Sequence, residues 1–110
     1  MANKNLDSLF AALSDTTRRA MIARLCEGSA SVSELAAPHQ MALPSFLKHL
    51  DKLEKAGLVT SRKTGRVRMV TLEAERLSAA QDWIDRYKSA WSRRLDQLER
   101  LAEDIEGKTS

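Results

Sequence analysis

Four basic residues with no acidic residue among them fall within one short segment, residues 58–72. They are Arg62, Lys63, Arg66 and Arg68. By contrast, residues 1–57 carry seven basic and six acidic residues, and residues 73–110 carry seven and nine. The excess of positive charge in this segment is therefore larger than the net charge of the whole chain, +3. Cations concentrated on a nearly neutral body indicate a contact with phosphates, such as those of nucleic acid.

The segment that carries these cations has the pattern of a β-hairpin. Apolar and polar residues alternate on both sides of Thr64-Gly65, as in half-buried strands. Thr64-Gly65 is the expected turn, because glycine accepts the positive φ of a tight hairpin. If the turn has the right length, Arg62, Arg66 and Arg68 share one face, where they would flank phosphates or reach the minor groove.

The residues just before the hairpin, 44–57, have the pattern of a helix narrow enough for a DNA groove. Their apolar stripe is Phe46, Leu50 and Leu53, and the face away from it is polar. On that polar side we expect the DNA contacts Ser45, Leu47, Lys48, His49 and Lys52. Ser45 and Lys48 would reach base edges, and Leu47 would meet a thymine methyl group. His49 lies near the core shoulder, which favours a structural hydrogen bond or a phosphate contact over base reading.

A short helix precedes this one. Ser31 and Glu34 have the spacing of a capping box, so this helix is expected to begin near Val32. Pro38 ends it within about two turns, because proline disfavours helix at the residue before it. Two helices joined by so short a link over residues 31–57 predict a helix-turn-helix.

The N-terminal part, residues 1–30, is expected to form two helices. Leu6, Leu9, Phe10 and Leu13 follow the spacing of an amphipathic helix. Asp15 is an N-cap for a second helix, whose core face includes Cys26. Near the start of this helix, Arg18 and Arg19 would contact the DNA backbone or pair with an acid. Cys26 is interpreted as a small buried hydrophobe, the alternative being a redox-sensing thiol, which requires exposure.

A long helix is predicted over residues 76–105, within a C-terminal dimerisation segment at 73–106, with a tail at 107–110. Its apolar residues recur every seven positions, at Leu77, Ile84, Trp91, Leu98 and Ile105. Thirty residues of helix would be about 45 Å long, more than a small winged core can cover. The surplus apolar stripe favours a second chain as its partner. The alternative is packing against the first helix of the same chain.

Length and composition limit the other possibilities. A chain of 110 residues is expected to be a single domain. It has no apolar run long enough for a membrane span and no signal-peptide core behind Met1, so we expect a cytoplasmic protein without a membrane partner. One cysteine and two histidines allow no disulfide, and they form no nucleophile–base pair or metal set. Neither an enzyme nor a bound cofactor is expected.

Four linked motifs, spread over nearly the whole chain, resemble the ArsR family of bacterial winged helix-turn-helix repressors. They are Leu13-Ser14-Asp15-Thr16-Thr17-Arg18-Arg19, Ser31-Val32-Ser33-Glu34-Leu35-Ala36, Leu43-Pro44-Ser45-Phe46-Leu47-Lys48-His49-Leu50 and Glu54-Lys55-Ala56-Gly57-Leu58-Val59. The C-terminal part resembles a subgroup in which a long last helix follows the wing.

The resemblance implies a mainly α fold with a small β-hairpin, which forms a homodimer through its first and last helices. The interface residues would be Leu6, Leu9, Phe10, Trp83, Ile84, Tyr87, Trp91, Leu95 and Leu98. It further implies that the dimer binds a two-fold double-stranded DNA operator and blocks transcription.

The sequence departs from the family at several positions. Metal-sensing members carry a Cys-x-Cys before the turn, whereas Ser33–Ala36 has no cysteine, and the last helix has no histidine. No metal site is therefore expected. Ala42 replaces the usual capping serine, which weakens the cap by about 1 kcal/mol.

Two questions stay open at this stage. The effector is unknown, with Cys26 and a cavity near Trp83 and Tyr87 as the places where one would act. The alternative function is a winged-helix module that binds an acidic protein partner and no specific DNA sequence.

Overall fold

The computed structural model describes residues 4–109, with the side chains of residues 5–108. The chain divides into two compact units, Met1–Ala80 and Gln81–Ser110, which we describe separately. Residues 1–3 and 110, which the predictions placed in the N-terminal helices and in the tail, lie outside the described residues.

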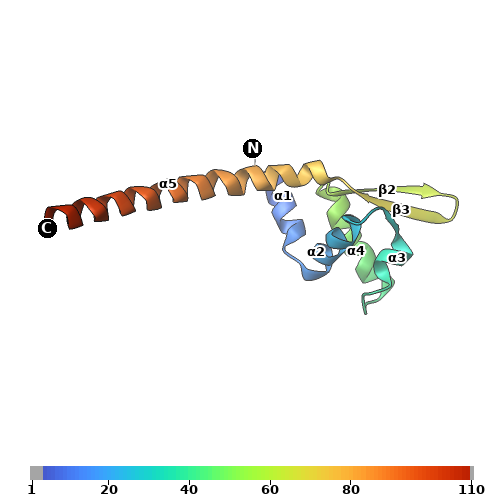
Figure 1. Cartoon of the computed structure of the whole chain (residues 1–110). Coiled ribbons are helices and arrows are strands. Elements are labelled where there is room, and N and C mark those ends of the chain that lie inside the picture. Colours follow the sequence, from blue (N-terminus) through green and yellow to red (C-terminus); the bar gives the residue numbers. More distant parts are fainter. Residues whose placement is uncertain (1–3, 110) are drawn as a thin grey trace. The chain divides into compact units, whose positions relative to one another are not determined.

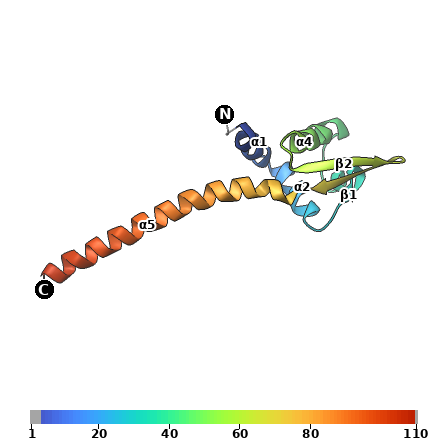
Figure 2. The same cartoon turned by 90° about the horizontal axis from the view of Figure 1, so that it is seen from above.

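The first unit combines helices with a small sheet (Figures 1 and 2). Its helices are α1 (Lys4–Leu13), α2 (Thr16–Leu25), α3 (Val32–Ala36) and α4 (Leu43–Lys55). Their apolar faces, together with one face of the sheet, enclose a core whose largest fully buried side chains are Phe46, Met21, Leu50, Leu53, Leu58, Val59 and Val70. The predicted helix-turn-helix is confirmed as α3 and α4.

The sheet has three antiparallel strands: β1 (Ala30–Ser31), β2 (Val59–Thr64) and β3 (Val67–Leu72), in the order β1-β3-β2. Strands β2 and β3 are the predicted wing. Strand β1 was not predicted, and it pairs Ser31 with Met69 and Ala30 with Val70. Because Ser31 is also the N-cap of α3, the sheet joins the wing directly to the helix-turn-helix.

Local signals in the sequence explain where these helices begin. Ser31 and Glu34 form the predicted capping box at α3, and the Asp15 carboxylate accepts a hydrogen bond from a backbone N–H of α2. Helix α4 begins at Leu43 without a side-chain cap, because its N-cap residue is Ala42.

The chain leaves α4 for the wing through Gly57. Gly57 has a φ of +76°, and its N–H donates to the Glu54 carbonyl while that of Leu58 donates to the Leu53 carbonyl. This pair of hydrogen bonds is the Schellman arrangement, which needs a left-handed residue at the position after the cap. A Cβ on this residue would lie 2.7 Å from Nε of Arg76, so the Arg76 side chain would also have to shift; the positive φ is what requires glycine.

A 3-10 turn, η1 (Ala74–Arg76), leads into α5 (Leu77–Thr109). The sequence predicts this helix to end near Ile105, but it continues through Gly107 to Thr109, so the predicted tail is helical up to that residue. Despite its length, α5 is too highly charged to cross a membrane, and among the described residues no other helix could do so.

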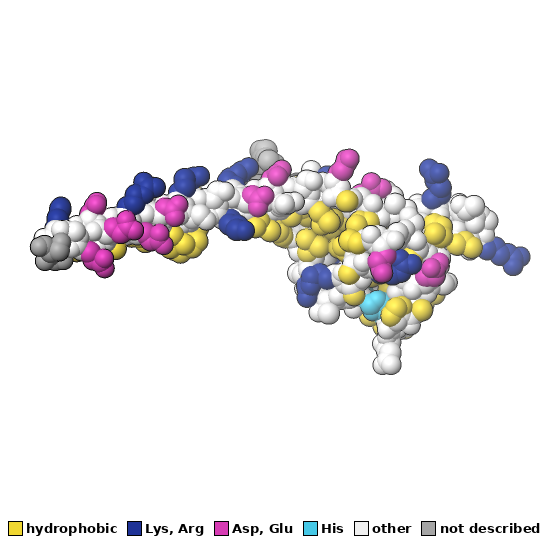
Figure 3. Space-filling view, in the orientation of Figure 1, with side chains coloured by type: hydrophobic (Ala, Val, Ile, Leu, Met, Phe, Trp, Pro, Cys, Tyr) yellow, Lys and Arg dark blue, Asp and Glu magenta, His cyan; other side chains and the backbone are white. Residues whose placement is uncertain are grey.

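The second unit, the part of α5 from Gln81 onward, exposes large apolar side chains. They are Trp83, Ile84, Tyr87, Trp91, Leu95, Leu98, Leu101 and Ile105, with exposed fractions between 41% and 61%. Figure 3 shows hydrophobic side chains along one edge of α5, with basic and acidic side chains mixed over the rest of its visible surface. The predicted amphipathic stripe is thus present, and its large apolar side chains are exposed.

Two expectations for the N-terminal helices are wrong. Cys26 is exposed; it is the C-cap residue of α2, one position beyond Leu25, the last buried residue of that helix. Leu9, predicted as an interface residue, is only 2% exposed and belongs to the core of its own chain. Leu6 and Phe10 are partly buried against the same core.

Candidate nucleic-acid interface

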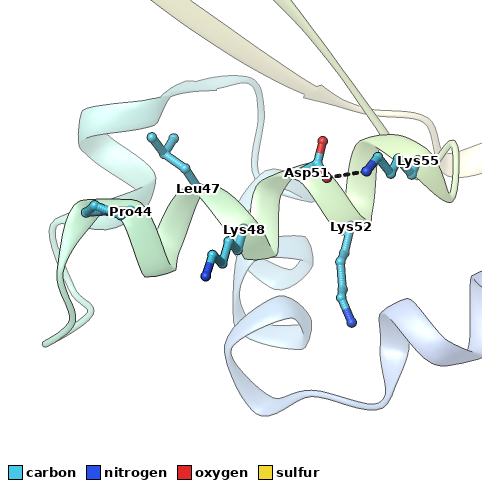
Figure 4. Close-up of a pocket in the computed structure, with 6 residues that line it drawn as sticks. All are labelled: Pro44, Leu47, Lys48, Asp51, Lys52 and Lys55. Carbon is cyan, nitrogen blue, oxygen red and sulfur yellow. Dashed lines mark ion pairs between the residues drawn. The ribbon is translucent and has the colours of Figure 1, made fainter.

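The outer face of α4 carries most of the predicted base-reading residues. Its buried face, formed by Phe46, Leu50 and Leu53, fixes the helix on the core and so fixes which residues point outward. A shallow groove of about 510 Å³ runs along the outer face (Figure 4). It is lined by Pro44, Leu47, Lys48, Asp51, Lys52 and Lys55.

Side chains in this groove divide between two sides of the helix. Leu47, Asp51 and Lys55 lie on one side in Figure 4, and Lys48 and Lys52 lie on the other. The Nζ of Lys55 donates to the Asp51 carboxylate at 2.9 Å, and this hydrogen bond raises the pKa of Lys55. Lys55 therefore neutralises the one carboxylate in the groove.

The predicted contacts on α4 differ in their accessibility. Ser45 and Lys48 are exposed in the N-terminal half of the helix, as base reading in a major groove requires. Leu47 is half-buried against the core, so only part of its side chain is available to a thymine methyl group. Lys52 is exposed and also borders a smaller hollow with Ser8 and Ala11 of α1, toward the C-terminal part of α4.

His49 takes part in a network that links α4 to α1 and α2. Its Nδ1 lies 2.9 Å from Nη1 of Arg18 and 3.6 Å from a carboxylate oxygen of Asp15. A guanidinium only donates hydrogen bonds, so Nδ1 accepts and the imidazole proton is on Nε2. Of the alternatives weighed for His49, this arrangement favours the structural hydrogen bond.

Arg18 is the centre of this network. It is 7% exposed, and it donates to the carbonyls of Ala12 at 2.7 Å and Ala11 at 3.1 Å. These carbonyls belong to the last turn of α1, where the backbone carbonyls have no hydrogen-bond donor within the helix itself. Arg18 is thus a structural residue and is not accessible to a DNA backbone, whereas Arg19 is exposed.

The two faces of the wing carry different residues. Lys63 pairs with Arg68, and Arg62 pairs with Met69. Since residues directly opposite share a face and neighbours alternate, Arg62 and Arg68 are on opposite faces. The expectation that both share one face with Arg66 is therefore wrong. The reason is the length of the turn: Gly65-Arg66, with a φ of +64° at Gly65, has two residues. A two-residue turn places even-numbered residues of one strand opposite odd-numbered residues of the other, which separates residues 62 and 68.

The cations of the wing also differ in whether they have partners. Arg68 forms an ion pair with Glu54 of α4 and donates from Nε to Ser61 Oγ at 3.0 Å. Arg62, Lys63 and Arg66 are exposed and have no hydrogen-bond or ion-pair partner within residues 4–109. Figure 3 shows basic side chains projecting from the end of the hairpin. Three cations at the tip are thus available to phosphates, and Arg68 is already engaged.

Reasoning from the sequence missed two residues that position this surface. Glu54 holds Arg68 from a position fourteen residues away, and no local pattern signals such a pair. Arg18 was expected to contact the DNA backbone or to pair with an acid, whereas its guanidinium donates to the carbonyls of Ala11 and Ala12 and contacts His49. As for metals, the part of the chain that the structure describes contains no group of three or more possible ligand side chains.

Comparison with known proteins agrees with this geometry. A family model described as a helix-turn-helix domain matches residues 13–62. The HTH-type transcriptional regulator Rv2034 of Mycobacterium tuberculosis is 37% identical over 101 residues, which cover 92% of this chain and 91% of that protein.

Solved structures give the same result. The crystal structure of an ArsR family transcriptional regulator is 45% identical, covers 81% of this chain and 98% of its own, and superposes with a TM-score of 0.78. The homodimeric winged helix-turn-helix DNA-binding domain of Mb0332 from Mycobacterium bovis shares the fold at 20% identity, with a TM-score of 0.62 over 77% of this chain and 79% of that one.

The match to Rv2034 extends over 92% of this chain, and the match to the 45% identical ArsR family structure extends over 81% of it. The protein belongs to the ArsR family of winged helix-turn-helix transcriptional regulators, which bind DNA.

Proposed function

We propose that the protein is a repressor that binds a palindromic operator as a homodimer. The observation that carries this proposal is the pairing of two surfaces on one short chain: the outward face of α4 beside the free cations of the wing, and the exposed apolar stripe of α5. The first surface fits DNA, and the second fits another copy of the chain.

In this proposal the N-terminal half of α4 enters the major groove, with Ser45, Leu47 and Lys48 toward the bases. Arg62, Lys63 and Arg66 contact phosphates beside it. The phosphate contacts provide affinity and its salt dependence, and the outer face of α4 provides sequence preference.

The dimer follows from the area that one chain can cover. A single recognition helix reads few base pairs, whereas two helices about 34 Å apart read both halves of a palindrome. Trp83, Tyr87, Trp91 and the leucines of α5 offer the apolar surface for such an assembly. A dimer bound at a promoter would exclude RNA polymerase from it and so would repress transcription.

The test is a fluorescence titration of the purified protein with the DNA upstream of its own gene and with a random duplex of equal length, at 50 and 200 mM salt. We expect tighter binding to the upstream DNA, protection of an inverted repeat, and a steep loss of affinity at the higher salt concentration. Equal, weak and salt-independent binding to both duplexes would contradict the proposal and favour a protein-interaction module.

A further inference from the structure

We propose that Glu54, Ser61 and Arg68 are positioning residues that set the orientation of the wing relative to the recognition helix before DNA is bound. This inference rests on the proposed function of α4 and the wing. It assigns to Arg68 a role different from that of the other wing cations, which act on DNA directly.

The three side chains form a closed ring of hydrogen bonds. Ser61 Oγ donates to Oε1 of Glu54 at 3.0 Å, Nη2 of Arg68 donates to the same oxygen, and Nε of Arg68 donates to Ser61 Oγ at 3.0 Å. Each member belongs to a different element, α4, β2 and β3 respectively. The ring therefore ties the end of the recognition helix to both strands of the wing.

The ring lies where the other supports of the wing end. Residues 62–68 are all exposed, so no core packing holds the outer half of the hairpin. Pairing with β1 stops at Met69. An isolated two-stranded hairpin is only marginally ordered in water, and Arg68 is the first residue past Met69 toward the tip. The Arg68–Glu54 pair thus extends the fixed part of the wing toward the tip.

The charge of Glu54 is otherwise unfavourable in its position. It lies in the last turn of α4, where the helix dipole disfavours an anion. A carboxylate in that position is useful as the partner of Arg68. Its side chain is 28% exposed and that of Arg68 is 43% exposed, so the pair is partly shielded from solvent.

The direction in which Glu54→Ala changes DNA affinity distinguishes a positioning role of Arg68 from a phosphate contact. If Arg68 acts on phosphates, Glu54→Ala releases it, removes a nearby negative charge and tightens binding to every duplex. If the ring positions the wing, Glu54→Ala weakens operator binding, by about threefold to tenfold, because the wing must be ordered on binding. Arg68→Ala should weaken it equally and leave the slope of log affinity against log salt unchanged.

The variants to compare are Glu54→Ala, Arg68→Ala and the exchange Glu54→Arg with Arg68→Glu, on the upstream duplex and on a random duplex. The exchange should return operator affinity to within about twofold of the wild type. Glu73→Ala is the matched control, since its carboxylate accepts from Thr60 at the base of the hairpin and touches none of the wing cations. It should not weaken operator binding.

Unchanged or tighter operator binding by Glu54→Ala would overturn the proposal, as would a salt slope that falls by about 1 in Arg68→Ala. Hydrogen exchange of the DNA-free protein provides a readout that does not depend on DNA. The amides of residues 62–68 should exchange faster in Glu54→Ala than in Glu73→Ala, and equal rates would also overturn the ring. If the wild-type protein showed no sequence preference, the proposed function would be refuted instead. The hydrogen-exchange rates would then still test whether the ring orders the wing.

Discussion

Arg18 and His49 are thirty-one residues apart in the chain, and their side chains meet at 2.9 Å, between Nη1 and Nδ1. Through this contact the last turn of α1, the start of α2 and the middle of the recognition helix share one buried guanidinium. The outward face of α4 is therefore oriented from behind by a polar contact as well as by apolar packing.

Replacing Arg18 should destabilise the fold. Arg18→Ala removes the donor to the carbonyls of Ala11 and Ala12 and to Nδ1 of His49, and it leaves a cavity. We expect a loss of about 2–4 kcal/mol in the free energy of unfolding. Urea unfolding at a fixed protein concentration measures it. Arg19→Ala is the control, because Arg19 is exposed, and a change of similar size there would contradict the assignment.

The Asp15 carboxylate should contribute stability only above a low pH. The hydrogen bond from the backbone N–H of Arg18 lowers the pKa of Asp15 below its ordinary value of 3.8, against the opposing effect of desolvation. A lowered pKa in the folded state means that the ionised form is stabilising above the ordinary value and that this contribution disappears as the pH falls through the folded value. Asp15→Asn retains a capping side chain without the charge. We expect it to be less stable than the wild type at pH 7, and we expect this difference to disappear as the pH falls below the folded-state pKa of Asp15, when unfolding is followed from pH 7 into the acid range. A difference that persists unchanged at low pH would exclude the charge as its cause.

Arg66 should act on all DNA sequences alike. It lies in the turn of the wing, exposed, where a phosphate contact releases a counterion. Arg66→Ala should weaken binding to operator and random duplexes by similar factors and reduce the salt slope by about 1 per chain. Titrations at four or more salt concentrations measure the slope. A slope equal to that of the wild type would remove the tip of the wing from the interface.

Lys48 should affect sequence preference. It is exposed in the N-terminal half of α4 without an ion-pair partner within the described range. Lys48→Ala should reduce the difference in binding free energy between the operator and a random duplex by roughly 1–3 kcal/mol, as measured by competition binding. Lys52→Ala, on the same helix but bordering α1, is the matched lysine and should lower both affinities together. A uniform loss in Lys48→Ala as well would make Lys48 a backbone contact.

Trp91 should be essential for assembly. It is 61% exposed at the middle of the apolar stripe, and an aspartate there would place a charge in the proposed dimer interface. Trp91→Asp should sediment as a monomer and lose specific DNA binding. Ser89→Asp introduces the same charge beside Lys88 and Arg93 and should remain dimeric. A dimeric Trp91→Asp would place the interface elsewhere.

Much of this architecture could be predicted from the sequence, because the signals are local. The spacing of Phe46, Leu50 and Leu53 gives the buried face of α4, and Ser31 with Glu34 gives the start of α3. Strand β1 could not be found in this way. Two residues have no alternation to detect, and the strand exists only because β3 offers a free edge beside it.

The roles of the charged residues were harder to predict, because they depend on contacts between distant positions. Arg68 looks identical to Arg66 in the sequence, yet the register of β3 places it on the face of the wing that meets Glu54. Arginine is usually found at the surface, and Arg18 is buried because its guanidinium donates to the last carbonyls of α1. In both cases tertiary structure decides which cations remain available to DNA.

The exposed thiol of Cys26 has a practical consequence for work with this protein. Oxidation in air would join two chains through an intermolecular disulfide, and the product would have twice the mass whether or not the apolar stripes meet. Sedimentation and gel-shift measurements of self-association therefore need a reductant throughout, or a Cys26→Ser background, so that covalent linkage is not mistaken for assembly.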